Sequence, residues 1–212
     1  MRRAPRRVRS SVRWRVLALA IASAVLAGCG QAAGSFSPSG PCTVDGRAAG
    51  AYPDLEALVP HEIGGRPATV DSGRNCSDKA LGTLTSHQVH EVRFAGATLD
   101  EGQGNGTVVA VFEAAPGQPA LAADWIDELY LAGALQSGKT DNTTTSHPTM
   151  ADAGVVYRLD TLNDLSQQTV VVLPDPTQVR VVIVATAVGP DASRAEHDKR
   201  VETAVAAAAA SR

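Results

Sequence analysis

Two pairs of strand-forming runs, each pair joined by a turn sequence, constrain the fold of this chain more than any other feature. Residues 167–173 (QQTVVVL) and 179–188 (VRVVIVATAV) flank a PDPT turn, and residues 90–100 and 107–114 flank EGQGNG. Valine, isoleucine and threonine favour strands, whereas glycine, proline, asparagine and aspartate favour turns. Each pair therefore predicts a β-hairpin, and the two hairpins predict an antiparallel sheet.

A helix is predicted over residues 118–136, between the two hairpins. Apolar side chains recur there at intervals of three or four, which places them on one buried face. These side chains are Leu121, Trp125, Leu129 and Ala132. The acidic residues Asp124, Asp127 and Glu128 are expected on the solvated face rather than as catalytic carboxylates.

A second long helix is predicted at the C-terminus, where Ser193 and Glu196 have the spacing of a capping box. Its apolar face consists of Val201, Ala204, Val205 and Ala208. Two shorter helices are predicted over residues 52–60, capped at Asp54, and 77–87, capped at Ser77. In residues 154–162, Val155, Tyr157 and Leu159 alternate with Val156, Arg158 and Asp160, which predicts a further strand.

This order of elements indicates an α+β fold, with an antiparallel sheet, two main helices packed on it and a loop-rich N-terminal part. The order over residues 90–210 resembles the PsbP-like fold of several small actinobacterial lipoproteins. Members of that class are mostly non-catalytic binding or accessory proteins, which is what the resemblance implies for this chain. A fold alone does not fix a function.

The N-terminus has the order of charge and apolarity found in secretory signal peptides. Residues 1–15 contain seven arginines and no acid, and an apolar run follows over residues 16–27. The tetrad that ends at Cys29, LAGC, resembles the bacterial lipobox, in which the cysteine thiol receives a diacylglyceryl group and the peptide is cleaved before it. We therefore expect residues 1–28 to be removed and Cys29 to be lipidated.

A lipidated Cys29 would anchor the protein to the outer face of the cell membrane, because two acyl chains hold a protein on a bilayer stably. Residues 29–41 are then a flexible, uncharged tether, and residues 42–212 form a single globular domain. Cleavage leaves 12 basic and 22 acidic side chains, a balance of −10. This acidity argues against nucleic acid as a partner.

The other two cysteines, Cys42 and Cys76, are expected to form a disulfide, which an extracytoplasmic setting permits. A redox or metal-binding pair is the alternative, but no CxxC spacing supports it. His87 and His90 are three residues apart, yet they lie at a predicted helix-to-strand transition with no third ligand at a suitable spacing, so we expect no metal site. His197, beside charged residues, is expected to be half-exposed.

We find no motif for a cofactor and no patterned nucleophile, so no cofactor and no catalytic residue is assigned. The GQGNG sequence precedes a strand instead of a helix, which excludes a dinucleotide fingerprint.

Two groups of polar residues remain as candidates for binding. Arg74 and Asn75 lie beside Cys76, where a disulfide would hold them on a rigid loop. Arg158 and Asp160 share one face of a predicted strand, where they either pair with each other or line a groove.

The sequence favours a lipid-anchored protein of the cell envelope that binds a small molecule or another envelope protein without catalysis. One alternative is an envelope hydrolase or transferase whose site forms only in the fold, using Arg74, His87 or His90. The other is a structural subunit that docks to a membrane complex through an apolar patch around Trp125 or Tyr130.

Overall fold

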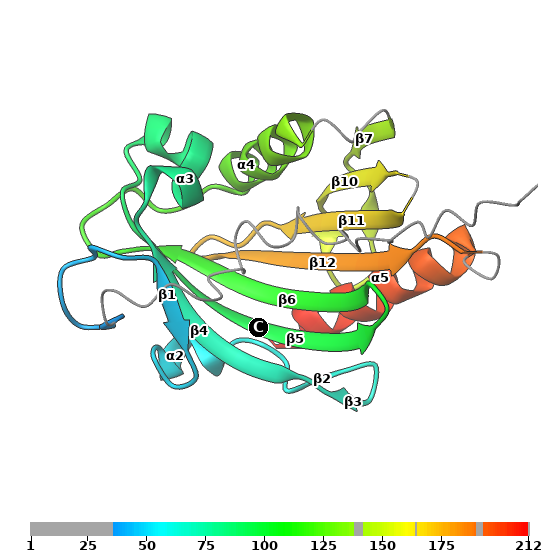
Figure 1. The fold of residues 1–212 in the computed structure, drawn as a ribbon, viewed down its shortest axis with the longest axis horizontal. Helices are drawn as coiled ribbons and strands as arrows, with labels where there is room; N and C mark the ends of the chain where they lie inside the picture. Colours follow the sequence, from blue (N-terminus) through cyan, green and yellow to red (C-terminus); the bar gives the residue numbers. More distant parts are fainter. Residues whose placement is uncertain (1–35, 138–141, 164, 190–192, 212) are drawn as a thin grey trace, which may run out of the picture.

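The computed structural model describes residues 36–137, 142–163, 165–189 and 193–211. The predicted signal peptide and Cys29 lie outside the described residues. Eight strands form one sheet in which every neighbouring pair is antiparallel (Figure 1). In spatial order they are β1 (Gly46–Ala48), β4 (Thr69–Asn75), β5 (Val92–Gly102), β6 (Asn105–Ala114), β12 (Val179–Ala187), β11 (Ser166–Leu173), β10 (Tyr157–Leu162) and β7 (Asn142–Ser146).

Both predicted hairpins are confirmed. Strands β5 and β6 pair up to Gly102 and Asn105, and the turn residues Gly102, Gln103 and Gly104 all have positive φ angles. Strands β11 and β12 pair from Leu173 and Arg180 onward. The pairing of β6 with β12 then joins the two hairpins into one sheet.

Two small two-stranded sheets lie beside the main one. The first pairs β2 (Glu62–Ile63) with β3 (Arg66–Pro67), and the second pairs β8 (Thr149–Met150) with β9 (Gly154–Val155).

The described residues form four α-helices, which together with the antiparallel sheet agree with the expected α+β class. They are α2 (Pro53–Glu56), α3 (Asp78–Leu81), α4 (Ala123–Gln136) and α5 (Arg194–Ala210), and a 3₁₀ helix, η1 (Gly82–His87), continues α3. Ser77 caps α3 and Ser193 caps α5, as predicted, each by accepting a backbone N–H three residues on. Asp54 does not cap the first helix, which begins at Pro53 after Tyr52.

Helix α4 begins later than the sequence predicts because Gln118 is held in a turn after β6, where its backbone N–H donates to the Ala115 carbonyl. Its side-chain carbonyl accepts hydrogen bonds from the backbone N–H groups of His90 and Glu91, and its amide donates to the Glu91 carbonyl. These bonds tie the segment before α4 to the start of β5. The helix therefore begins only at Ala123.

The sheet is buried on both faces (Figure 1). Alternate residues of β6 belong to different cores, since Val109 and Val111 lie in one cluster and Ala110 and Phe112 in the other. The first cluster includes the predicted apolar face of α5, made of Val201, Ala204, Val205 and Ala208. The second includes Ile126 and Ala134 of α4. The two longest helices thus contribute to cores on opposite sides of the sheet.

The predicted disulfide is confirmed, since Cys42 and Cys76 are bonded with their Cα atoms 6.0 Å apart. It joins the segment before β1 to the end of β4. Asp45 reinforces this junction by accepting hydrogen bonds from the backbone N–H groups of Cys76 and Ser77, at 2.7 and 2.9 Å. The loop-rich N-terminal part is thereby attached to one edge of the sheet.

Replacement of Cys42 and Cys76 together by serine should lower the free energy of unfolding by about 3 to 4 kcal/mol, the loop-entropy estimate for a closure of 34 residues. Denaturant unfolding of the variant and the parent protein measures this difference. A Cys29→Ser variant is the control, because it removes a cysteine without touching the disulfide. Free thiols at both positions in protein isolated without reductant would contradict the bond.

Candidate functional site

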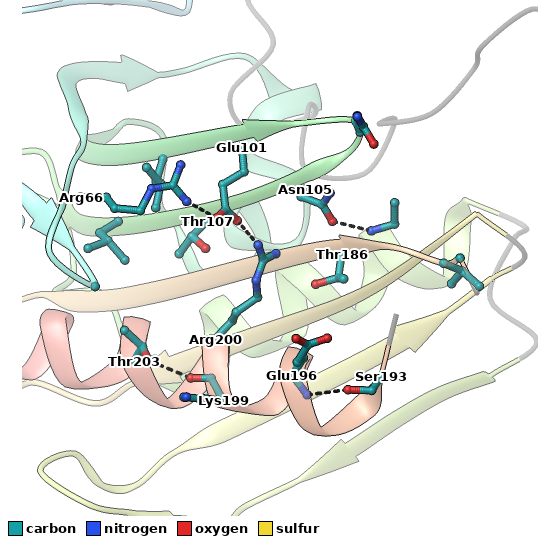
Figure 2. Close-up of a pocket in the computed structure, with 17 residues that line it drawn as sticks. Arg66, Glu101, Asn105, Thr107, Thr186, Ser193, Glu196, Lys199, Arg200 and Thr203 are labelled. Carbon is teal, nitrogen blue, oxygen red and sulfur yellow. Dashed lines mark hydrogen bonds and ion pairs between the residues drawn. The ribbon is translucent and has the colours of Figure 1, made fainter. Parts of the chain in front are cut away.

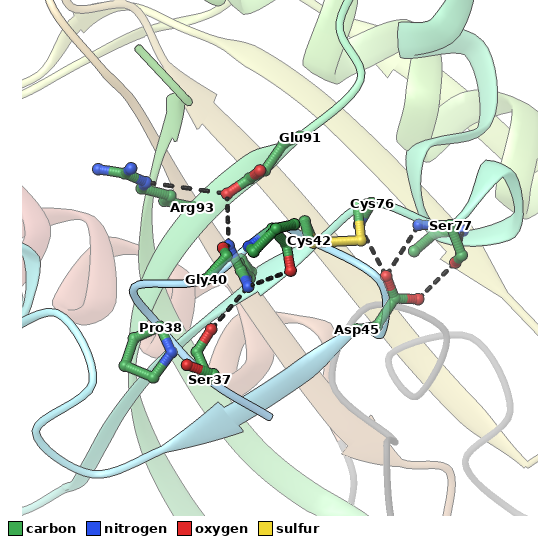
Figure 3. The surroundings of a disulfide bond; sticks show 12 residues. Ser37, Pro38, Gly40, Cys42, Asp45, Cys76, Ser77, Glu91 and Arg93 are labelled. Atoms are coloured by element: carbon green, nitrogen blue, oxygen red, sulfur yellow. Dashed lines mark hydrogen bonds and ion pairs between the residues drawn. A yellow bond between two sulfur atoms is a disulfide. The ribbon is translucent and has the colours of Figure 1, made fainter. Parts of the chain in front are cut away.

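Arg74, a predicted binding residue, is committed to the protein's own backbone. Its side chain is 4% exposed, and its Nη1 donates to the carbonyl of Gly40 at 2.7 Å. Its Nη2 donates to the carbonyls of Ser37 and Pro41, at 2.6 and 3.0 Å (Figure 3). Glu91 lies 3.3 Å from Nη1 and balances the charge. Arg74 therefore holds residues 37–41, which the sequence assigned to the tether, against the domain.

Asn75, the neighbouring candidate, is also buried, with 7% of its surface exposed. It lines a small internal cavity below α3 and α4, together with Leu81, Ile126 and other core side chains. The cavity has a volume of about 10 Å³, which is the space of about one water molecule. Neither Arg74 nor Asn75 is placed to bind an external ligand.

Arg158 and Asp160 pair with each other, which was one of the two predicted arrangements. Arg158 Nε and Nη2 donate to the two carboxylate oxygens of Asp160, at 2.9 and 3.0 Å. Nη2 also donates to Asp198 on α5 at 2.6 Å, and Arg194 joins both carboxylates. Burial alone would raise the pKa of Asp198, but hydrogen bonds from Arg158 and Arg194 hold it below its usual value. This network attaches β10 to the start of α5.

His197 is fully buried, so the expectation of a half-exposed side chain was wrong. Its Nε2 lies 2.8 Å from the hydroxyl of Thr169, and its Nδ1 lies 2.8 Å from the hydroxyl of Thr186. Thr169 donates its own proton to Asp160, so it accepts from Nε2–H. Nδ1 then accepts from Thr186, and the chain of hydrogen bonds is complete with a neutral imidazole.

The burial of His197 follows from the helix period. It precedes Val201 by four residues, which extends the apolar face of α5 by one turn toward the N-terminus. The charged neighbours Glu196 and Asp198 suggested a surface position, but adjacent residues on a helix point in different directions. Burial lowers the pKa of His197 from 6.5 to about 4, despite the opposing effect of Asp198 and Asp160.

Because of this pKa, the stability of the protein should fall as the pH drops from 6.5 toward 4. In that window the unfolded chain binds a proton at His197 that the folded protein does not bind. The full effect is about 3 kcal/mol at 1.4 kcal/mol per pKa unit. Denaturant unfolding at several pH values should show a smaller loss for His197→Gln than for the parent protein.

The exposed His61 provides the matched control. His61→Gln should keep the pH dependence of the parent protein. If His197→Gln keeps it as well, the buried histidine is not its source.

The α5 groove is a cavity of about 670 Å³ at the turn end of the β5–β6 hairpin. Its walls come from that hairpin, the last residues of β12, the first half of α5 and the β2–β3 turn (Figure 2). A volume of 300 to 1,000 Å³ is typical of small-molecule sites. The groove is therefore the part of the described structure best suited to hold a ligand.

Polar residues line the groove at positions where the alternation of each strand would place core side chains. Thr107 continues the face of Val109 and Val111, Thr186 continues that of Val184, and Glu101 continues that of Leu99. The same inward face is thus apolar at the centre of the sheet and polar at its end. A strand pattern that turns polar on its buried side is the signal that sequence reasoning missed.

Charged residues meet across the groove. Glu101 on β5 contacts both Arg66 of β3 and Arg200 of α5, as Figure 2 shows. Lys199 and Glu196 also line it, so the five charged side chains carry a net charge of +1. These residues come from three separate segments of the chain, so their spacing in the sequence does not reveal the site.

The two histidines considered as metal ligands lie elsewhere. The His87 ring stacks on Trp125 with centroids 4.3 Å apart, and its Nε2 lies 3.2 Å from Glu128. His90 is exposed, and its backbone N–H binds Gln118. Of the residues named for the enzyme alternative, His87 thus contacts Glu128, one of the acids of α4. Arg74 contacts Glu91 and none of those acids. Among the described residues, no group of three or more potential ligands could hold a metal ion.

No helix in the described part of the chain is both long enough and apolar enough to cross a membrane. Comparison with protein-family models, curated proteins and solved structures finds no significant match.

Proposed function

We propose that this protein is a lipid-anchored module of the cell envelope that binds a small molecule in the α5 groove. The observation that carries the proposal is the groove itself, a cavity of ligand size in which Glu101, Thr107 and Thr186 occupy inward-facing strand positions. At the centre of the sheet the inward positions are filled by valine and alanine. Polar side chains at core positions cost stability unless they are hydrogen-bonded, and ligand binding is one function for which such a cost is retained.

A binding role is favoured over catalysis because His197, the histidine bonded to a groove hydroxyl, has a pKa too low for a general base. Thr186 is a groove hydroxyl that donates to His197, an arrangement that resembles a nucleophile with its base. A general base works best when its pKa is near the working pH, whereas burial lowers the pKa of His197 to about 4. This chain of hydrogen bonds is better suited to positioning Thr186 than to removing its proton.

The docking alternative has less support. It expected an apolar patch around Trp125 or Tyr130, but both side chains are partly buried against the core beneath α4. Trp125 is further covered by the ring of His87. The resemblance to PsbP-like lipoproteins stays a prediction, and it agrees with a binding role.

The lipid anchor is proposed from the lipobox, and the structure limits the distance that can separate Cys29 from the folded domain. Since Arg74 holds the chain from Ser37 onward, only residues 30–35 lie between Cys29 and the first described residue, Phe36, which makes seven Cα–Cα steps. Seven such steps span at most about 25 Å when the chain is fully extended. A lipidated Cys29 would thus keep the domain close to the outer face of the cell membrane.

Replacement of Cys29 by alanine should abolish lipidation and processing of the N-terminus. Metabolic labelling with an alkyne fatty acid, followed by mass measurement of the N-terminal peptide, tests this outcome. The variant with both Cys42 and Cys76 changed to serine is the control and should still be labelled. A labelled Cys29→Ala protein would refute the anchor.

Blocking the groove should abolish ligand binding. Thr203 lines the groove on the exposed side of α5, whereas Ala206, one turn away, is exposed outside it. We expect at least one compound from a panel of sugars, amino acids, hydroxy acids and sugar phosphates to raise the melting temperature. At one hundred times its dissociation constant it would add about 2.7 kcal/mol, a rise of about 5 to 10 °C.

The ligand-induced rise in melting temperature should be lost in Thr203→Trp, which fills the groove, and kept in Ala206→Trp, which does not. Equal rises in both variants would place the ligand outside the groove.

A further inference from the structure

We infer that the α5 groove binds the carboxylate or phosphate group of a small hydroxylated anion, an inference that rests on the proposed binding function. The groove contains three cationic side chains and two carboxylates, and its buried donor without a partner belongs to one of the cations. A ligand that satisfies it must therefore bring acceptor oxygens.

Arg200 is the central donor. Its Nη2 contacts Glu101, but its Nη1 is buried and has no hydrogen-bond partner among the described residues. A buried donor without a partner is costly, and a charged one more so. Figure 2 shows the guanidinium reaching from α5 toward the hairpin in which β6 carries both Thr107 and Asn105.

Two neutral donors line the same groove. Thr107 is 4% exposed, and no hydrogen bond joins its hydroxyl to any other described residue. Asn105 accepts a hydrogen bond from the backbone N–H of Ala187 at 3.0 Å. Its carbonyl oxygen is thus used, and its amide N–H groups face no described partner. An oxyanion accepts several such bonds at once.

One of the two carboxylates of the groove, that of Glu101, is already paired. Glu101 contacts the guanidinium groups of both Arg66 and Arg200, which together more than balance its charge. Lys199 adds a further positive charge, and Glu196 a negative one. The groove has a net charge of +1, whereas the whole chain has a net charge of −3. The side chains of the groove therefore attract an anion that the rest of the protein repels.

Thr186 adds a requirement for a hydroxyl group. Because it donates its proton to His197, its oxygen faces the groove as an acceptor. A ligand hydroxyl beside the anionic group would donate to it. Together with Arg200 and Thr107, this position selects a hydroxy acid or a polyol phosphate over a simple anion or an uncharged sugar.

Three probes with the same three-carbon skeleton test the inference: glycerate, glycerol 3-phosphate and the neutral glycerol. Dissociation constants are measured by calorimetry with the full-length protein in nonionic detergent, in a phosphate-free buffer of low ionic strength. At least one of the two anions should bind ten or more times more tightly than glycerol. The preference should weaken at high salt.

Two variants locate the anion. Thr107→Val removes the free hydroxyl without breaking a hydrogen bond of the protein, so it should fold normally and bind the anion about tenfold more weakly. Arg200→Gln should weaken binding at least as much. Arg47→Gln is the matched control, because Arg47 is similarly exposed, at 34% against 33%, and pairs with Asp71 outside the groove.

The outcomes separate the two proposals. If neutral compounds bind in a manner sensitive to Thr203→Trp and the anions show no preference, the groove is a binding site and the anion assignment is wrong. If no probe and no panel compound binds, both proposals fail. Equal affinity of Thr107→Val and the parent protein for the anions also overturns the assignment.

A fourth probe identifies the source of the anion. Dihexanoyl phosphatidic acid carries glycerol phosphate on a lipid. Tighter binding than that of free glycerol 3-phosphate would assign the group to a membrane lipid, and weaker binding to a soluble molecule.

Discussion

The pairing of β6 with β12 is the interaction on which the rest of the structure depends. It joins two hairpins that are separated in the sequence by α4, by the strands β7 and β10 of the main sheet and by the small β8–β9 sheet. The pairing runs over seven residue pairs, from Phe112 and Val179 to Gly106 and Ala185. Val109, Val111, Val182 and Val184 face one core, and Ala110, Val181 and Ile183 face the other. Because these strands are apolar on both faces, each face must be covered, and α5 and α4 contribute to the two coverings.

The local parts of this fold could be predicted, because their signals lie in short windows. Turn residues between β-branched runs identified both hairpins, and Ser77 and Ser193 marked the starts of their helices. The extent of α4 could not be predicted, since it depends on the side chain of Gln118 binding the backbone at Glu91. The β6–β12 pairing was also out of reach, because periodicity says which side of a strand is buried and not which strand lies beside it.

The site was harder to predict than the fold. Arg74 and Asn75 were selected for their rigid surroundings, but rigidity here comes from burial, and burial removes them from solvent. Thr107, Glu101 and Thr186 are ordinary polar residues near strand ends, and they become informative only when the inward face of each strand is known. His197 links this site to the core, since its two hydrogen bonds join a groove residue on β12 to a buried residue on β11. Hydrogen bonds through His197 thus connect the polar end of the sheet to its packed core.

The attachment of the N-terminal segment has a mechanical consequence. A pull on a tethered N-terminus would first act on residues 37–41, where the carbonyl contacts of Arg74 resist it. If those contacts broke, the load would pass through the covalent bond between Cys42 and Cys76 to β4. It would bypass the three-residue edge strand β1 and meet a strand paired with β5 over seven residues. The chain that such a force could draw out therefore ends at Cys42, and the sheet and the α5 groove would keep their shape under tension.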